Sequence, residues 1–167
     1  MPRTSGAILA LGFWAGIVQA QLAPPDPDWK EVDAPPPPQL RTDRLVPIEI
    51  SSSALRFGVH PASVAVGADG IVRYVVVATS ATGAVNGLYE GIRCSTAEVR
   101  LYARHSRDRG WVQVEDSRWQ PLHGNRVSGH SLAIARNGAC LGSAPNQNAA
   151  RVVRDLGGSP NWRFWNN

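Results

Sequence analysis

Residues 71–94 read IVRYVVVATSATGAVNGLYEGIRC, and this stretch decides the fold. Its first eight residues, Ile71–Ala78, are apolar and mostly β-branched or aromatic, with Arg73 as the one exception. The run is too short for a membrane helix and predicts a strand that is buried on both faces. Asp69-Gly70, just before it, is typical of a turn, so Ser63–Val66 is predicted to be its hairpin partner.

Further strands are predicted on both sides of this run. Apolar and other residues alternate over residues 55–59 and, most clearly, over residues 98–104, as in strands with one buried face. Asp108–Gly110 is predicted to turn the second of these into a strand at Trp111–Val114. Four or five strands with short links favour an antiparallel sheet.

The C-terminal third changes to a helical period. Four apolar residues between 149 and 156 share one helix face at spacings i, i+3, i+4 and i+7. Asn146 is a good N-cap and Gly157 a good C-cap, so a helix is predicted between them. Residues 125–136 are predicted as a short helix that ends at Asn137-Gly138, with a strand as the alternative. Strands followed by one or two C-terminal helices define an α+β fold.

The N-terminus has the composition of a secretory signal peptide. Arg3 supplies the positive charge, residues 6–18 are apolar, and Val18-Gln19-Ala20 fits the small-x-small rule for cleavage after Ala20. The alternative is an uncleaved membrane anchor, which the short apolar run and the good cleavage site disfavour. We therefore expect an exported, periplasmic protein with no transmembrane span once the signal peptide (1–20) is removed.

The rest of the chain divides into three parts. Residues 21–44 hold seven prolines, four of them consecutive at Pro35–Pro38, and are predicted as a disordered leader in extended polyproline II conformation. A linker is the default interpretation, a peptide ligand for an aromatic groove is the alternative, and Trp29 is a candidate to dock on the domain. Residues 45–156 have the length of one domain, and residues 157–167 form an aromatic tail.

The end of the quoted stretch carries a resemblance to a known family. YEGIRC (Tyr89–Cys94), preceded by VRYVVVATS (Val72–Ser80), resembles the signature of the cryptic-neisserial-protein-one-like family of small bacterial envelope proteins. The resemblance covers roughly Trp29–Leu156 and implies a periplasmic protein or a lipoprotein, with no established activity. No cysteine lies near the predicted cut, so the lipid-anchored form does not apply here. Further matching positions are Leu55-Arg56-Phe57, Pro61, Glu98–Arg104, Trp111, Trp119, His130 and Cys140.

The chain contains two cysteines, Cys94 and Cys140. In an exported protein they are expected to oxidise, which predicts a disulfide between the end of the sheet and the helical segment. Their spacing does not match a C-x-x-C redox motif. The four histidines also lack the spacing of a metal site, so no metal and no cofactor are predicted.

Glu90 and His130 are the candidates for catalysis. Glu90 lies between Tyr89 and Gly91, where an inward-facing carboxylate needs a partner, and Arg93 or His130 is expected to supply it. A structural ion pair or hydrogen bond is one interpretation, and a general acid or base is the other. The chain has no G-x-S-x-G elbow, so a serine triad is not predicted.

Arg100, Tyr102 and Arg104 are the candidates for ligand binding. On a regular strand they share one face, and arginines beside an aromatic ring suit phosphate, carboxylate or sugar ligands. A solvated outer face, with Glu98 paired to Arg100, is the alternative. The net charge of +4 and the pI near 9.7 fit an anionic partner. In the periplasm this partner is expected to be an anionic envelope component or an envelope protein, and not nucleic acid.

Three functional classes are consistent with these residues. We expect a binding or envelope-assembly module that uses the arginine and tyrosine face. A periplasmic hydrolase or transferase that uses Glu90 and His130 is the alternative, and a structural partner of an outer-membrane complex is the third class. A pocket that contains both Glu90 and His130 favours the enzyme, whereas a flat basic sheet face favours the binding module.

Overall fold

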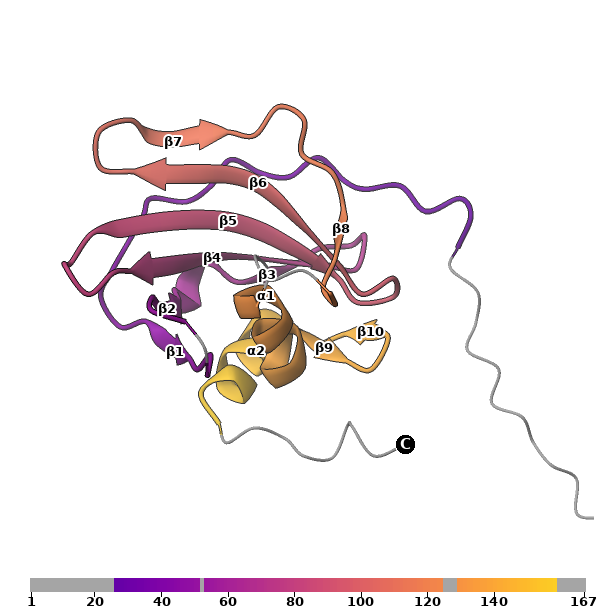
Figure 1. The fold of residues 1–167 in the computed structure, drawn as a ribbon. Helices are drawn as coiled ribbons and strands as arrows, with labels where there is room; N and C mark the ends of the chain where they lie inside the picture. Colours follow the sequence, from indigo (N-terminus) through magenta and orange to yellow (C-terminus); the bar gives the residue numbers. More distant parts are fainter. Residues whose placement is uncertain (1–25, 52, 125–128, 159–167) are drawn as a thin grey trace, which may run out of the picture.

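The apolar run at residues 71–78 forms the central strand of an antiparallel sheet in the computed structural model of the chain (Figure 1). This strand, β4 (Ile71–Thr79), has eight successive buried residues. It pairs along its whole length with β5 (Val85–Arg93). The prediction of a strand buried on both faces is confirmed, and two other parts of the chain cover those faces.

The structure describes residues 26–51, 53–124 and 129–158. The predicted signal peptide, its cleavage after Ala20 and most of the predicted aromatic tail lie outside the described residues and stay predictions. None of the helices in the described part of the chain has the length and apolar character that a bilayer crossing requires.

The sheet contains eight strands. Six follow one another in the order β1-β2-β4-β5-β6-β7, while β3 pairs with β4 and β8 pairs with β6. The predicted hairpin partner of β4 is present, because Ala65 and Val66 pair with its first half. Strands of two or three residues are too short to show a period of two, which explains why four or five strands were expected. The remaining strands are β1 (Val46–Ile48), β2 (Arg56–Val59), β3 (Ala65–Val66), β6 (Glu98–Ser106), β7 (Gly110–Gln113) and β8 (Gln120–Pro121).

Two helices follow the sheet, so the α+β prediction is confirmed. Helix α1 (Gly129–Ile134) continues into a π-helical turn, η3 (Ala135–Ala139). The helix predicted for 125–136 is therefore confirmed from Gly129 onward, while residues 125–128 lie outside the described residues. The segment ends at Ala139, slightly later than predicted. The last elements are β9 (Cys140–Leu141), β10 (Ala144–Pro145) and α2 (Ala149–Leu156), and a 3₁₀ turn, η1 (Pro61–Ser63), joins β2 to β3.

The caps of α2 correct one prediction. Asn148, not Asn146, is the N-cap, because its side chain accepts a hydrogen bond of 3.0 Å from the backbone N–H of Arg151. Asn146 is buried instead and donates 2.8 Å to the carbonyl of Gly138 and 2.9 Å to Asp155. It thus ties α2 to the π-helical turn before it. Gly157 is the C-cap as predicted.

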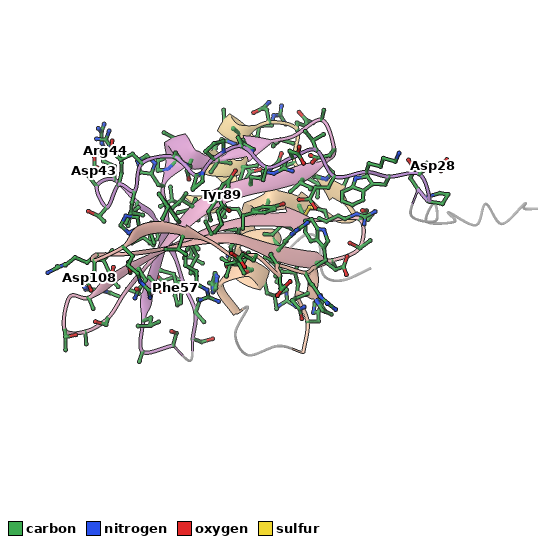
Figure 2. All side chains as sticks on the ribbon, turned by 90° about the horizontal axis from the view of Figure 1, so that it is seen from above. Asp28, Asp43, Arg44, Phe57, Tyr89 and Asp108 are labelled. Atoms are coloured by element: carbon green, nitrogen blue, oxygen red, sulfur yellow. A yellow bond between two sulfur atoms is a disulfide. The ribbon has the colours of Figure 1, made fainter. Side chains whose placement is uncertain are left out.

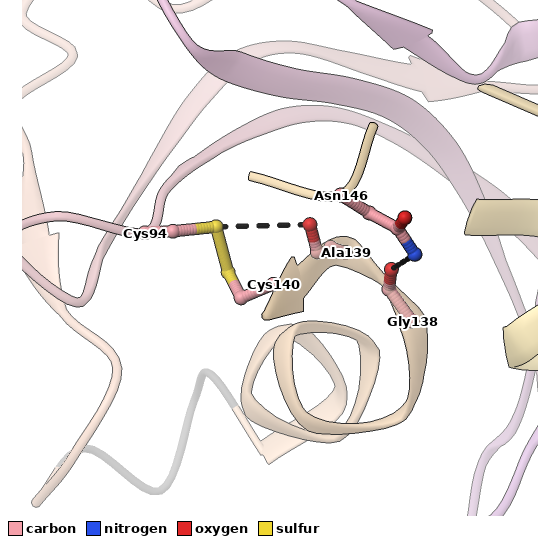
Figure 3. Close-up of a disulfide and its surroundings, with 5 residues drawn as sticks. All are labelled: Cys94, Gly138, Ala139, Cys140 and Asn146. Carbon is pink, nitrogen blue, oxygen red and sulfur yellow. Dashed lines mark hydrogen bonds between the residues drawn. A yellow bond between two sulfur atoms is a disulfide. The ribbon is translucent and has the colours of Figure 1, made fainter. Parts of the chain in front are cut away.

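The predicted disulfide is present and fastens the helical segment to the sheet (Figure 3). Cys94 follows β5 directly, and Cys140 begins β9 directly after η3, with 5.7 Å between their Cα atoms. The sulfur of Cys94 also lies 3.7 Å from the carbonyl oxygen of Ala139. The bond and the Asn146 contact together fix the C-terminal end of the π-helical turn.

The sheet has an inner face, covered by α1, η3 and α2, and an outer face, covered by residues 26–44, which we call the leader (Figure 1). Figure 2 shows the leader passing from Asp28 to Asp43 and Arg44 along one side of the sheet, with Tyr89 beneath it and Phe57 on the other side. The inner core is the larger one and includes Val72, Tyr74, Val76, Ile92, Ile134, Val152 and Leu156. The outer core consists of Val75, Tyr89, Tyr102 and Ala103 beneath Ala34, Leu40 and Trp111.

The leader corrects the prediction of a disordered segment at 21–44, as far as its described residues are concerned. Trp29 docks as expected, since its indole N–H donates 2.8 Å to the carbonyl of Asp69. The N–H of Val32 donates 3.0 Å to the Asp69 carboxylate, and the indole of Trp111 donates 2.9 Å to the carbonyl of Pro38. Prolines prevent helix and sheet hydrogen bonds, but they leave backbone carbonyls free to accept hydrogen bonds from the domain.

A β-bulge in β6 changes which residues face each side. Tyr89 pairs with Ala103 and Glu90 with Leu101, so Tyr102 is the extra residue. Before the bulge Arg100 faces outward, and after it His105 does. Arg104 therefore points to the inner side, and the prediction that it shares a face with Arg100 and Tyr102 is wrong.

Candidate functional site

A cleft of about 540 Å³ opens on the inner face, between the sheet and the start of α1. Its walls are apolar side chains from β2, β5 and β6. Polar residues enter from three directions: Glu90 from β5, Arg104 from β6, and His130 with Ser131 from α1. The volume is within the range of small-molecule sites. The apolar lining includes Leu55, Phe57, Leu88, Val99, Leu101 and Val114.

Glu90 lies at the base of the cleft and accepts three side-chain hydrogen bonds. His130 Nε2 lies 2.9 Å from its Oε1, Tyr74 donates to its Oε2 at 2.8 Å, and Ser131 donates to the same oxygen at 3.0 Å. Only 5% of Glu90 is exposed, so these donors replace the water that the carboxylate would otherwise bind. Of the two partners predicted for Glu90, His130 is the one that the structure supplies.

The electrostatics of this cluster favour an ionised carboxylate. Burial opposes ionisation of Glu90, but the hydrogen bond and positive charge that His130 supplies, with the hydrogen bonds from Tyr74 and Ser131, lower its pKa below the ordinary value. Burial and the neighbouring Glu90 carboxylate raise the pKa of Tyr74 well above its usual range, so Tyr74 stays a donor. Phe57 stacks on the His130 ring, with 4.9 Å between ring centres and 9° between planes, and fixes its orientation.

The geometry does not form a serine nucleophile. Ser131 is 1% exposed and donates its hydroxyl to Glu90, while His130 also pairs with Glu90, so no imidazole is hydrogen-bonded to this serine as a base. Once a serine nucleophile is excluded, the Glu90 carboxylate and the His130 imidazole remain as a pair in which the carboxylate orients the imidazole. Nε2 faces Glu90, so Nδ1 is the ring nitrogen of His130 that remains for another partner.

The rim of the cleft carries charge of both signs. Arg104 and Arg118 are exposed and line it, as does Asp116 on the loop that follows β7. Arg104 reaches the rim because of the bulge in β6. Two guanidinium groups and one carboxylate at the opening favour an anionic group on any molecule that enters.

Arg100 and Tyr102, the other predicted ligand residues, lie on the outer face and bind the leader. Arg100 forms a salt bridge of 2.7 Å to Glu31, in place of the Glu98 pair considered from the sequence. The Tyr102 hydroxyl donates 2.7 Å to the second oxygen of Glu31, and the indole of Trp119 donates at 3.2 Å. Burial, and then the contact with Glu31, raise the pKa of Tyr102. We call these residues, with Arg73, the Glu31 cage.

Arg73 is a functional residue whose role the sequence did not reveal. It is buried, with a bidentate pair to Asp69 at 2.7 and 3.2 Å and a 2.9 Å hydrogen bond to the carbonyl of Val32. It also lies 3.8 Å from Glu31. Burial opposes the charge on Asp69, but Arg73 and two backbone N–H groups lower the pKa of this carboxyl. The sequence signal for this role was the position of Arg73, the one charged residue within the apolar run at 71–78.

Arg93 takes a different role from the one predicted. Its guanidinium lies 3.5 Å from the ring centre of Trp29, a cation–π contact that holds the start of the leader against the end of β5. Trp29 also meets the edge of Trp119, with 6.3 Å between ring centres. Arg93 and Arg100 thus contact the leader, whereas Arg104 lines the cleft.

Within the described ranges there is no group of three or more histidine, cysteine, aspartate or glutamate residues arranged to hold a metal ion. Fold and site together define a small α+β protein with a ligand-sized cleft on one face of its sheet and its own proline-rich leader on the other. The chain belongs to the CNP1-like family, whose sequence model matches residues 25–157. The resemblance noted from YEGIRC is thereby confirmed, and the matched range includes the leader. No curated protein and no solved structure matches the chain.

Proposed function

We propose that the protein is a periplasmic binding protein whose inner cleft takes a small molecule with an apolar body and an anionic group. The observation that carries this proposal is the cleft itself, in which apolar walls lead to the arginine-bearing rim at Arg104 and Arg118. The outer face, which the sequence favoured, supports this role less because the leader covers Arg100 and Tyr102. The proposed partner is still an anionic envelope component, as expected from the sequence, but the proposed binding site is now the inner cleft and not the outer face.

The test is a binding titration of the full mature chain with 1-anilinonaphthalene-8-sulfonate, an anionic aromatic fluorophore. Leu101→Trp fills the cleft, and Val112→Trp, at an exposed position of β7, is the matched control. We expect saturable binding by the wild type and by Val112→Trp, and about tenfold weaker binding by Leu101→Trp, since about 1.4 kcal/mol of lost contact corresponds to tenfold. Equal binding by all three proteins would contradict the proposal.

Catalysis is a second candidate, and one observation favours it. The Glu90–His130 pair lies on the cleft wall, and this is the convergence that the sequence analysis named as favouring a hydrolase or transferase. In that case Glu90 orients His130, and His130 acts as general base toward a water or a substrate hydroxyl. A screen with chromogenic esters and phosphoesters tests this candidate. Turnover that His130→Gln abolishes, with the fold retained by circular dichroism, would establish it over simple binding.

Export is part of the proposal. The composition of residues 1–20 and the oxidised Cys94–Cys140 pair support a periplasmic address. N-terminal sequencing of protein from the periplasmic fraction should find Gln21 first. A chain that still begins at Met1 or Pro2 would contradict this expectation.

A further inference from the structure

The leader lies on the outer face with a period of three residues. From residue 31 to residue 40 every third residue is half-buried, namely Glu31, Ala34, Pro37 and Leu40, while the residues between them are exposed. Three residues make one turn of a polyproline II helix, so these four form one edge of such a helix. The outer face therefore has the properties of a peptide-binding site that recognises this conformation, and not merely of a surface that a linker crosses.

One end of this site recognises a carboxylate. In the Glu31 cage the two oxygens are shared between Arg100 and Tyr102 at 2.7 Å, with Trp119 at 3.2 Å and Arg73 at 3.8 Å. Every one of these donors comes from the sheet or the segment after β7, and only the acceptor comes from the leader. A glutamate at this point of a bound peptide is therefore a specificity determinant.

The other end recognises the backbone and a leucine. The indole of Trp111 donates 2.9 Å to the carbonyl of Pro38, a contact that an extended proline-rich chain can accept. Leu40 lies over Gly87, where a Cβ atom would come within 2.7 Å of the leucine side chain. Gly87 thus leaves the space that Leu40 occupies, nine residues beyond Glu31.

The link between the leader and the sheet has the properties of a hinge. All four residues of 41–44 are exposed, and Asp43 forms salt bridges with its neighbours Arg41 and Arg44, at 3.2 and 3.4 Å. Arg44 has a φ of 53°, a left-handed conformation that residues other than glycine seldom adopt. Opening this link relieves the unfavourable backbone conformation and breaks exposed ion pairs that contribute little to stability.

We propose that the outer face also binds the leader of a second copy of this chain, so that two copies exchange leaders and form a dimer. The second copy carries the same glutamate, prolines and leucine at the same spacing, so every contact described above is regained across the two molecules. Reciprocal exchange closes at two copies. At low protein concentration the tethered leader outcompetes the second copy, and dimers increase with concentration.

The experiment uses the full mature chain and a biotinylated synthetic peptide of residues 26–42 that carries photo-leucine at position 40. The receptor is the Glu31→Ala chain, whose own leader has lost its cage contact. We expect light-dependent crosslinks that map to β5 near Gly87. They should fall by about tenfold or more when the peptide itself carries Glu31→Ala, because the charge-assisted contact is absent. They should also be lost when an extra alanine after Pro36 breaks the three-residue register.

A second measurement starts from the wild-type chain. Sedimentation equilibrium of the wild-type chain, from micromolar to millimolar protein, should show a reversible dimer. Removal of Thr42 and Asp43 should shift the dimer to lower concentration, because a shortened link hinders the return of the leader to its own sheet but not its exchange. Glu98→Gln, on β6 outside these contacts, serves as the control and should leave the dimer unchanged. A wild-type chain that stays monomeric throughout, with a peptide that does not crosslink to β5, would overturn the proposal. Dimers that are unaffected by shortening of the link would overturn it as well, since they would use another surface.

Discussion

Both faces of the sheet hold a carboxylate out of water, and they do so by different means. On the inner face Glu90 belongs to the sheet itself, and its donors are His130, Tyr74 and Ser131. On the outer face Glu31 arrives on the leader, and arginines of the sheet bind it. The inner cluster is part of the continuous core, whereas the outer one joins a separable segment to that core. Changes on the inner face should therefore affect global stability, and changes on the outer face should affect docking of the leader.

The largest effect is expected from removal of the disulfide. The Cys94→Ser, Cys140→Ser double variant should lose about 3–4 kcal/mol of the free energy of unfolding, because the bond closes a long loop in the unfolded chain. Urea unfolding measures this loss. The comparison of faces is sharpened if limited proteolysis at the 41–44 link still reports a docked leader below the transition. Simultaneous release of leader and helices would contradict the separation of the two faces.

Glu90→Ala should come next. The variant leaves Tyr74, His130 and Ser131 without their shared acceptor, and the cost of such buried unpaired groups is about 1–3 kcal/mol. Chemical denaturation compares it with Glu115→Ala, an exposed carboxylate on the loop after β7 that serves as the control. A fully stable Glu90→Ala protein would break the comparison, because it would mean that the inner carboxylate is as dispensable as an exposed one.

The pH dependence of stability should carry the signature of Glu90. Its pKa is lower in the folded than in the unfolded chain, so folding favours the ionised form. Its contribution is complete above the ordinary carboxyl value of 4.5 and is lost as the pH falls through the lower folded pKa. Between wild type and Glu90→Gln, the difference in unfolding free energy should shrink below that pH. A difference that stays constant down to the acid transition would argue against an ionised Glu90.

Glu31→Ala should cost less, about 1 kcal/mol, because Arg100 is partly exposed and solvent screens the pair. The loss should decrease in high salt. Asp33→Ala, an exposed leader position two residues away, is the control and should leave stability unchanged. Limited proteolysis at the 41–44 link should become faster in Glu31→Ala only. Equal proteolysis in both variants would show that the cage does not hold the leader.

The smallest stability effect is expected for Arg104→Ala, within about 0.5 kcal/mol of wild type, as for an exposed surface residue. Binding of the anionic fluorophore by the cleft should nevertheless weaken, and the remaining binding should depend less on salt. Arg107→Ala, on the turn after β6, is the control, because its side chain is exposed and does not line the cleft. Unchanged fluorophore binding would remove Arg104 from the proposed site.

Local signals predicted much of the fold. The apolar run gave the central strand, the two cysteines gave the disulfide, and the isolated carboxylate at Glu90 indicated a buried polar contact with His130. In each case the physical requirement acts on few residues: burial of apolar surface, oxidation of paired thiols, satisfaction of a buried charge. Requirements of this kind can be read from residue types alone.

The parts that were missed depend on long-range contacts. The leader has the composition of a disordered segment, and composition reports the absence of internal hydrogen bonds but not the presence of external ones. Its three-residue period, from Glu31 to Leu40, was a signal that could have been read beside the prolines. The bulge could not be read in this way, because residues 98–104 continue to alternate regularly in the sequence where the structure contains an extra residue.

That extra residue in β6 makes the strand behave like a reading frame. Up to Tyr102 the even-numbered residues of β6 face the outer side, and beyond it the odd-numbered residues do. If the same residues ran on without the bulge, the effect on the strand would be that of a frameshift on a gene, since everything downstream would appear on the wrong side. Arg104 would turn toward the leader and His105 toward the cleft. The extra residue thus keeps the two halves of β6 in phase with the faces that they serve, and an inserted residue should be tolerated in the hairpin turns on either side of β6 better than within the strand.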